Sequence, residues 1–424
     1  MERIKGKIPK RRFEGFTDDW EQRKLLGCIQ KITDFRGRTP KKLGMDWSES
    51  GYLALSALNV KDGYIDFTQD VHYGNQELYD KWMTGNELHK GQVLFTTEAP
   101  MGNVAQVPDN RQYILSQRTI AFDVKDDYIT ENFLATVLRT PKVFEDLTAL
   151  SSGGTAKGVS QKSLAAVDII IPTDLKEQEY IARYFANLNN LITLHQRKLE
   201  KLKNIKKSYL SEMFPQEDEK KPKRRFKGFT DDWEQRKFSD CYRMSSGYAF
   251  KMSDYCDGGI GLINGESIQH GIINDDNLNH LPESFIQQYP DFVLKEGDIV
   301  VGLNRPITNG NIKIARIPSK YNDSLLYQRA GKIVYKENCD KNFSYVLLSQ
   351  EILKHTLVEA VGSDQPFIST SKLDKWQMMI PSNIEEQKKI GNYFRNLDHL
   401  ITLHQRKLEK LKHIKQAYLN EMFV

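Results

Sequence analysis

The chain has 424 residues and a mass of 49.1 kDa, which is enough for roughly two to four domains with ordinary hydrophobic cores. With 39% hydrophobic and 28% charged residues, it holds too much core material for a chain that stays disordered. Its 61 basic and 56 acidic side chains leave a net charge of +5, which permits a polyanionic partner without demonstrating one.

Several protein classes are disfavoured by what the sequence lacks. No apolar run approaches the roughly 18 residues needed to cross a bilayer, and the first residues do not resemble a secretory signal. The 4 cysteines form no C-x-x-C pair, and the 9 histidines show no H-E-x-x-H or zinc-knuckle spacing. We therefore expect a cytoplasmic protein with no membrane partner, no metal and no disulfide.

The first element is an arm at residues 10–24 (KRRFEGFTDDWEQRK), which recurs at residues 223–237 with 14 of 15 residues identical. A repeat of this length indicates a tandem duplication. Cys28 and Cys241 follow the two arms at the same distance. Their equivalent places favour small buried residues over reactive thiols.

The segments after the arms, residues 25–171 and 238–380, have diverged far more. Both contain short β-rich runs separated by Gly, Asn, Pro and Asp, with a few helical stretches, and this pattern predicts two α+β domains of common fold and different surfaces. We expect strands at residues 52–60, 92–97, 119–124, 261–268, 298–303 and 331–335, and helices at 132–138 and 343–353.

Each copy ends in a long amphipathic helix that begins near residue 176 or 385, and residues 192–214 recur at 401–423 with 19 of 23 identical. About 40 residues at 1.5 Å each give a rod of roughly 60 Å. A lone helix cannot bury its apolar stripe, so we expect the two to pair as an antiparallel coiled-coil spacer about a pseudo-twofold axis, with a globular domain at each end.

His195 and His404 fall on this stripe at equivalent heights. A hydrogen-bonded polar residue in the seam is favoured over a switch role.

Polar residues are also identical between the copies, which shared packing alone does not require. This identity indicates one partner bound twice. A recent duplication is the alternative, although the diverged middles weigh against it, and recombination that exchanges the middles between fixed arms also fits. The candidate partner-binding residues are Asp18, Asp19, Trp20, Asp231, Asp232 and Trp233 in the arms, and Gln196, Arg197, Gln405 and Arg406 on the helices.

A third repeated feature is the motif P-x-x-x-x-E-Q at the start of each long helix, formed by Pro172, Glu177 and Gln178 and by Pro381, Glu386 and Gln387. With these motifs, the two arms and the two ITLHQRKLEKLK helices, the whole chain resembles the specificity subunit of type I restriction-modification systems. The resemblance implies two target recognition domains, each reading one half of a split, asymmetric sequence in double-stranded DNA. It also implies two methyltransferase subunits, which bind S-adenosylmethionine, and restriction subunits, which use ATP and Mg, as partners.

On this resemblance the chain itself is a non-catalytic subunit that binds no cofactor. The residues agree, since no G-x-x-x-x-G-K-[ST] and no N/D-P-P-Y/F run occurs. The organisation that we expect is an N-terminal arm (1–24), target recognition domain 1 (25–171), spacer helix 1 (172–214), a basic linker with the repeated arm (215–237), target recognition domain 2 (238–380) and spacer helix 2 (381–424).

DNA contact is predicted from charge and loop chemistry. Basic clusters at Arg36, Arg38 and Lys41 and at residues 220–227 would neutralise phosphates, whereas for Lys198–Lys207 on the helix DNA contact and solvent or protein contact stay equally open. Arg reads guanine, and Asn or Gln reads adenine. The candidates for DNA binding in loops and on strands are Thr97, Asn103, Arg111, Gln117, Arg118 and Lys157 in the first domain, and Asn304, Arg305, Asn309, Asn311, Arg316, Lys320, Gln328, Arg329 and Gln365 in the second.

The matched Arg118 and Arg329 favour a structural or phosphate role, because a position kept in both domains is a poor place to encode different sequences. Loops that differ are better candidates for base contacts, and for each single loop residue ordinary turn chemistry is the alternative. Two other functions stay open: a standalone DNA-binding regulator or decoy, and a coiled-coil protein adaptor without a nucleic-acid role.

Overall fold

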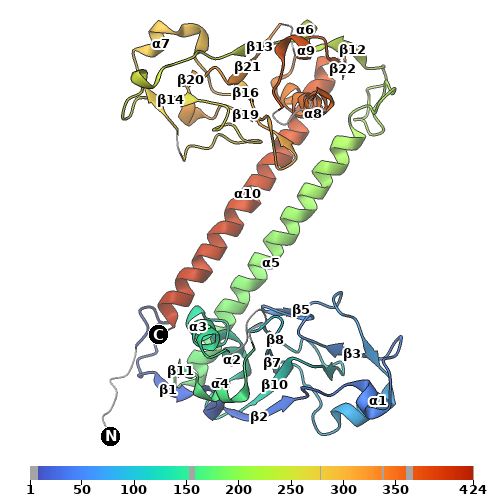
Figure 1. The fold of residues 1–424 in the computed structure, drawn as a ribbon, viewed down its shortest axis with the longest axis vertical. Coiled ribbons are helices and arrows are strands. Elements are labelled where there is room, and N and C mark those ends of the chain that lie inside the picture. The colour runs from blue at the N-terminus through green and yellow to red at the C-terminus, as the bar shows by residue number, and fades with distance from the viewer. Residues whose placement is uncertain (1–7, 152–157, 277, 337–338, 360–365, 424) are drawn as a thin grey trace. The chain divides into compact units, whose positions relative to one another are not determined.

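The computed structural model describes residues 8–151, 158–276, 278–336, 339–359 and 366–423 (Figure 1). The chain divides into two compact units: unit 1 comprises residues 1–198 and 404–424, and unit 2 comprises residues 199–403. Each unit holds one arm, one globular domain and a part of each long helix. In the described residues, no helix has the length and apolar character needed to cross a membrane.

The central sheet of unit 1 is antiparallel and has the order β2 (Ile29–Asp34), β10 (Thr119–Val124), β7 (Val93–Thr96), β8 (Val104–Gln106). A second, smaller sheet places β3 between β6 and β9. The other elements of the first domain are η1 (Leu25–Cys28), η2 (Pro40–Leu43), β3 (Tyr52–Leu55), β4 (Val60–Lys61), β5 (Tyr64–Ile65), β6 (Tyr73–Gly74), α1 (Gln76–Met83), β9 (Ile114–Leu115), α2 (Glu131–Val137), α3 (Pro141–Ala149) and α4 (Gln161–Ala166).

The central sheet of unit 2 repeats this order with β13 (Tyr242–Ser246), β21 (Ala330–Tyr335), β16 (Ile299–Gly302) and β19 (Ile314–Arg316). Here too a smaller sheet, with β14 between β15 and β20, accompanies it. The other elements are α6 (Phe238–Cys241), η3 (Met252–Asp254), β14 (Ile260–Ile263), β15 (His280–Leu281), α7 (Phe285–Gln288), η4 (Pro290–Phe292), β17 (Ile307–Thr308), β18 (Asn311–Ile312), η5 (Ser319–Tyr321), β20 (Leu325–Leu326), α8 (Lys341–Glu359) and α9 (Thr370–Leu373).

The predicted α+β class and the common fold of the two middles are confirmed. The central strands are mostly apolar because both sheet faces are covered: Phe95 and Phe122 join the core on the helix side, whereas Leu94 and Ala121 join the core beneath α1. The predicted helix at 132–138 is α2, and the one at 343–353 is the longer α8. Cys28 and Cys241 are both buried, as expected.

Each arm ends in a strand that closes its domain. The first arm strand, β1 (Glu21–Lys24), pairs antiparallel with β11 (Asp168–Ile171), which immediately precedes the first long helix. The second, β12 (Glu234–Lys237), pairs in the same way with β22 (Gln377–Ile380). The repeated arms therefore occupy the same place in both units.

The long helices are α5 (Leu175–Glu212) and α10 (Ile384–Met422), each starting one residue before the predicted position. In unit 1, the ring centroids of Tyr184 and Tyr418 are 5.2 Å apart, and His195 lies beside His404. Residue numbers therefore rise on one helix as they fall on the other. In unit 2, Lys206 Nζ lies 2.6 Å from Asp398 Oδ1, and the ring centroids of Tyr209 and Tyr393 are 5.4 Å apart, so the numbers again run in opposite directions. The predicted antiparallel pairing is thus confirmed within each unit (Figure 1).

A buried ion pair fastens each arm to the start of a helix. Arg12 donates two hydrogen bonds, 2.6 and 2.7 Å long, to the carboxylate of Glu177, whose side chain is fully buried. Arg225 holds Glu386 with the same two distances. The carboxylate raises the pKa of the Arg12 guanidinium through these hydrogen bonds, and two parallel bonds of this kind fix the geometry as well as the charge.

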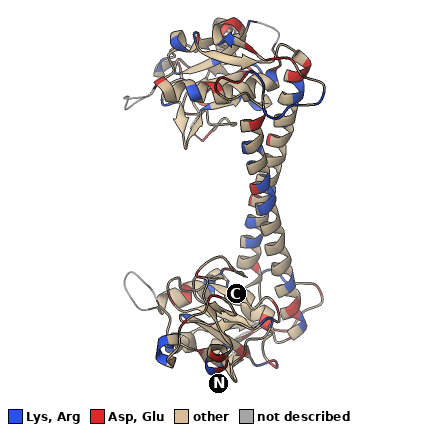
Figure 2. Ribbon diagram, turned by 90° about the vertical axis from the view of Figure 1, so that its right-hand side faces the viewer, with Lys and Arg blue, Asp and Glu red and all other residues tan. Residues whose placement is uncertain are grey.

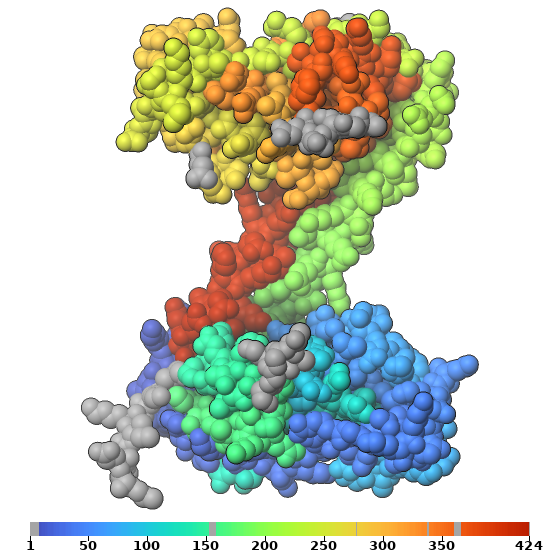
Figure 3. Space-filling model, in the orientation of Figure 1, coloured from blue at the N-terminus to red at the C-terminus, as the bar shows by residue number. Residues whose placement is uncertain are grey.

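The neighbouring arginine of each arm reaches the end of the other helix. The Arg11 amide donates to the carbonyl of Glu421 at 3.0 Å, and its side chain pairs with the Glu421 carboxylate at 2.6 Å. Arg224 makes the same two contacts with Glu212. Each Arg-Arg pair therefore links the beginning of one helix to the end of its antiparallel neighbour, and the space-filling view shows the last turns of α10 against residues of unit 1 (Figure 3).

The glutamine of each E-Q motif satisfies backbone groups at the helix start. The Gln178 amide accepts from the Thr130 N–H at 3.0 Å and donates to the Pro172 carbonyl at 2.9 Å. Gln387 accepts from the Asp340 N–H and donates to the Pro381 carbonyl at the same distances. The E-Q motif is therefore a structural device that seats both helices on their domains.

Replacing Glu177 with Gln should destabilise unit 1 by about 3–5 kcal/mol, because it leaves the mostly buried Arg12 charge without its counter-ion. Chemical denaturation of the variant and the parent chain checks this expectation. The matched control is Glu421→Gln, which removes a carboxylate from the solvent-screened pair with Arg11 and should change the stability much less. Equal effects of the two substitutions would contradict the role assigned to the buried pair.

The histidine pair makes the seam of unit 1 sensitive to acid. The two Nδ1 atoms are 2.8 Å apart, so one ring donates its proton to the other, as the predicted hydrogen-bonded role requires. Burial, then His404, Lys407 and Lys198, lower the pKa of His195. Because His195 binds a proton less readily in the folded chain than in the unfolded chain, acid favours unfolding. The contribution of the histidine pair to the stability of unit 1 is therefore present above about pH 6.5 and is lost as the pH falls below it.

A variant with both His195 and His404 replaced by Leu should therefore lose less stability than the parent between about pH 8 and about pH 5. Hydrogen exchange of the α5 amides at the two pH values measures this difference locally. His270 and His355, whose pKa values burial also lowers, stay unchanged in unit 2 as an internal reference. An identical loss of α5 protection in parent and variant would refute the prediction.

Candidate nucleic-acid interface

Backbone hydrogen bonds place the Gln-Arg pairs of the two domains at equivalent positions. In unit 1 the Thr97 amide donates to the Arg118 carbonyl at 2.8 Å. In unit 2 the Leu303 amide donates to the Arg329 carbonyl at 3.0 Å. Both arginines therefore lie beside the loop that leaves the central strand of their sheet, β7 or β16.

A cavity of about 370 Å³, which we call groove 1, lies beside this loop in unit 1. Four predicted DNA-binding residues line it: Arg38, Lys41, Gln117 and Arg118. Two of them are engaged in the fold, since Arg38 donates to the Trp82 carbonyl at 2.7 Å and Gln117 donates to the Arg38 carbonyl. Lys41 is exposed, and Arg118 pairs with Glu98 at 2.9 Å.

An aromatic wall and two acidic residues complete groove 1. Trp47 stacks on His72 with ring centroids 5.5 Å apart, and His72 lies 3.1 Å from the Asp70 carboxylate. Asp46 lines the same cavity. The groove therefore holds both signs of charge.

The equivalent loop of unit 2 borders a larger cavity of about 670 Å³, which we call groove 2. Its lining includes three predicted residues, Asn304, Arg305 and Arg329. Both arginine side chains are exposed and have no ion-pair partner among the described residues. Residues that the sequence analysis missed add a cation and aromatic rings to the lining: Lys313, Tyr255, Tyr327 and Phe367.

Groove 2 combines cations with aromatic rings, which is the chemistry that binds phosphates and stacks on bases. Phe367 is 65% exposed and directly follows Pro366, whose carbonyl accepts a hydrogen bond from the Arg305 amide at 3.1 Å. The interleaving of basic and aromatic residues was not visible in the sequence because these residues come from segments far apart in the chain.

Other candidates in unit 1 lie outside groove 1. Thr97 is buried and is not available to DNA in this conformation, whereas Asn103 is half-buried and donates to the Val60 carbonyl at 2.9 Å. Arg36 pairs with Asp34, and Arg111 pairs with Asp109 at 2.9 Å, both at the surface. The predicted DNA contact of Thr97 is corrected accordingly, and that of Asn103 stays a prediction.

In unit 2 the Arg316 guanidinium is half-buried over the Tyr345 ring, 4.1 Å from its centroid, and burial lowers its pKa. Arg316 therefore packs against the domain, and its DNA contact stays a prediction. Lys320 pairs with Asp275 at 2.6 Å. The remaining candidates of this domain are exposed: Asn309 and Asn311 in the β17–β18 hairpin, and Gln328.

Lys157 and Gln365 lie outside the described residues. Within those residues, no three His, Cys, Asp or Glu side chains are grouped as metal ligands would be.

The predicted partner-binding residues fall into two groups. The four aspartates of the arms are exposed, as are Gln196, Arg197, Gln405 and Arg406 on the helices. Trp20 and Trp233 are 3% and 2% exposed and pack against Phe133 and Phe343. Their identity between the copies reflects a shared core, so the prediction of a partner contact is corrected for both tryptophans.

Basic residues are also distributed along both long helices (Figure 2). Among Lys198–Lys207, Lys206 is held by Asp398, whereas Lys198, Lys201, Lys203 and Lys207 are exposed. These four side chains are accessible both to DNA and to a protein partner.

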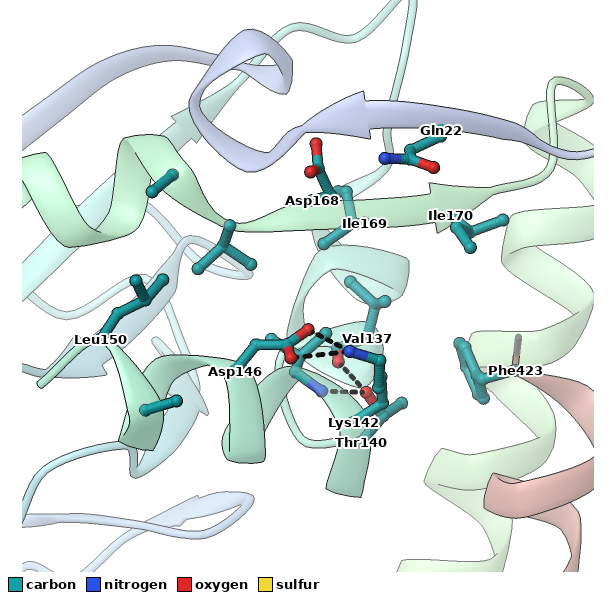
Figure 4. Close-up of a pocket in the computed structure, with 14 residues that line it drawn as sticks. Gln22, Val137, Thr140, Lys142, Asp146, Leu150, Asp168, Ile169, Ile170 and Phe423 are labelled. Carbon is teal, nitrogen blue, oxygen red and sulfur yellow. Dashed lines mark hydrogen bonds and ion pairs between the residues drawn. The ribbon is translucent and has the colours of Figure 1, made fainter. Parts of the chain in front are cut away.

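A separate cavity of about 460 Å³ lies between α3 and β11, with Phe423 at its edge (Figure 4). The ion pair of Lys142 and Asp146, 2.6 Å apart, stands within it. None of the predicted DNA-binding residues lines this cavity, so grooves 1 and 2 are the candidate interface.

Both copies of the repeat match a known protein family. Residues 17–204 and 230–413 each match the type I restriction modification DNA specificity domain. The chain is 28% identical over 408 residues to the specificity subunit of the type I restriction enzyme MjaVIII of Methanocaldococcus jannaschii, covering 95% of this chain and 92% of that protein. It is 25% identical over 303 residues to the EcoAI specificity subunit of Escherichia coli, covering 71% of this chain and 49% of that protein.

Among solved structures, the S subunit of a type I restriction-modification system from M. genitalium superposes with a TM-score of 0.66 at 14% identity, over 99% of both chains. This match shows that the two chains share a fold.

Proposed function

Because the chain belongs to the type I restriction modification DNA specificity domain family, whose model it matches twice, we propose that grooves 1 and 2 each read one half of a bipartite, asymmetric sequence in double-stranded DNA. One observation carries this proposal: the same strand order and the same loop contacts present different side chains in the two units. A common frame with unlike linings suits two different half-sites.

In this proposal the paired helices act as the spacer between the half-sites. The rod length expected from about 40 helical residues, roughly 60 Å, exceeds one turn of DNA, roughly 34 Å, so each domain would enter its own major groove.

The partners follow from the repeated surface. Exposed aspartates at equivalent places in both arms, together with the exposed Gln-Arg pairs on both helices, support two copies of one partner, the methyltransferase subunit. Restriction subunits would join this complex. S-adenosylmethionine would then belong to the methyltransferase subunits, and ATP and Mg to the restriction subunits, while the chain itself performs no catalysis.

Exchanging residues 25–171 for the corresponding segment of another family member should change one half of the methylated sequence and leave the other half unchanged. Sequencing of modified adenines in cells that carry the chain and its methyltransferase measures the outcome. A change in both halves would contradict modular reading. Specific DNA binding without any methyltransferase partner would favour a regulator or decoy, and no DNA binding even at low salt would favour an adaptor.

Replacing Asp18, Asp19, Asp231 and Asp232 by Asn should weaken assembly with the methyltransferase on the order of tenfold, or ~1.4 kcal/mol, with little change in folding, because these carboxylates are exposed. Co-purification and a thermal melt of the same variant check both halves of the expectation. The contrasting variant, Trp20→Ala, should instead lower the melting temperature, because it empties a core position. Undiminished co-purification of the folded aspartate variant would refute the assignment.

A further inference from the structure

Glu98 and Asn304 occupy equivalent positions in the two domains but carry different chemistry. Glu98 follows Thr97, whose amide donates to the Arg118 carbonyl, and Asn304 follows Leu303, whose amide donates to the Arg329 carbonyl. Each also forms an isolated β-bridge, Glu98 with Gly158 and Asn304 with Phe367. We infer that this position controls how strongly the conserved arginine, Arg118 or Arg329, holds DNA phosphate, and thereby sets the salt dependence of each half-site. The inference rests on the proposed function and adds a positioning residue to it.

In unit 1 the carboxylate competes with DNA for the arginine. Glu98 Oε1 lies 2.9 Å from Arg118 Nε, with the side chains 44% and 55% exposed. A phosphate that approaches Arg118 must displace this carboxylate and also meets its negative charge. The pair is open to solvent, so displacement is possible, and Arg118 contributes less than a free guanidinium.

In unit 2 the equivalent position holds the uncharged amide of Asn304. Arg329 is exposed and has no ion pair among the described residues. Arg305 and Lys313 line the same groove, and Lys313 donates to the Gly265 carbonyl at 3.4 Å. Among the described lining residues, three cations stand against one carboxylate, that of Glu266, which gives groove 2 a positive excess.

Groove 1 has no such excess. Arg38 is bound to the Trp82 carbonyl, Lys41 is exposed, and Asp46 and Asp70 face the same cavity. Because Arg118 is paired with Glu98, few cations of groove 1 are available to bind phosphate. Unit 2 should therefore anchor the phosphates more strongly, and unit 1 should depend more on contacts that are insensitive to salt.

The conserved arginine suits a phosphate contact for a reason independent of charge. Its backbone carbonyl is fixed by the same hydrogen bond in both units, while the residues around it differ. A side chain kept in both frames can recognise what both half-sites share, and phosphate is the group common to all DNA sequences.

The test uses the full chain with its methyltransferase partner and a mixed-sequence duplex of about 30 base pairs, roughly three helical turns. Binding is measured from about 50 to about 200 mM salt. Each additional contact between a DNA phosphate and a Lys or Arg side chain changes the slope of log K against log salt by about 0.9. We expect Glu98→Gln to steepen the slope by about one such step and to tighten binding at low salt. Asn304→Glu should flatten the slope by a similar amount.

Three controls isolate the mechanism. Glu98→Asp keeps the carboxylate and should bind like the parent. The double variant E98Q/R118A should lose the gain of E98Q, because the gain requires the released guanidinium. Asp146→Asn makes the same change of net charge and frees Lys142 in the cavity beside α3, away from groove 1, and should leave the slope unchanged.

An unchanged slope in E98Q, or an equal gain in E98Q/R118A or D146N, would overturn the inference and leave the proposed function intact. A parent complex that binds no DNA even at low salt would overturn the proposed function, and this inference with it.

Discussion

The buried pairs Arg12–Glu177 and Arg225–Glu386 are the constraint on which the rest of the structure depends. A carboxylate removed from water is tolerated only where its partner is held in good geometry, so the arm cannot leave the helix start without exposing an uncompensated charge. The adjacent arginines, Arg11 and Arg224, then bind the end of the other helix. A short run of four arm contacts in each unit thus fixes the closing strand, both helix ends and the register of the seam.

This rigid frame explains how the two domains share a fold while differing at the surface. The contacts that define the frame are made by residues identical in both copies, or by backbone atoms, as in the amide bonds to the Arg118 and Arg329 carbonyls. Some lining side chains also hold the fold, as Arg38 and Gln117 do in groove 1 and Asn264 does in groove 2. The exposed groove positions that make no such contact, such as Arg305 and Phe367, can change without loss of the fold.

The sequence predicted what periodicity and repetition encode. The helix bounds of α5 and α10, the central strands and the common α+β fold followed from apolar spacing and from the comparison of two copies in one chain. Pairing between distant side chains leaves no such signal. The identity of Trp20 and Trp233 looked like a shared outer surface but comes from a shared core. Thr97 looked available for DNA because nothing in the spacing of its loop showed that its side chain is buried. Lys313 and Tyr255 were missed because only the fold brings them to Arg329.

The division of the chain gives the two units different histories during synthesis. Unit 2 is continuous in sequence, so all its residues have left the ribosome once residue 403 has emerged. Unit 1 also needs residues 404–423, which follow unit 2 in the sequence. The contact between Arg11 and Glu421 forms only then, although Arg11 is translated long before Glu421. The unit that is begun first is therefore completed last, and a nascent chain that has emerged only as far as residue 403 would hold every residue of unit 2 but lack part of unit 1.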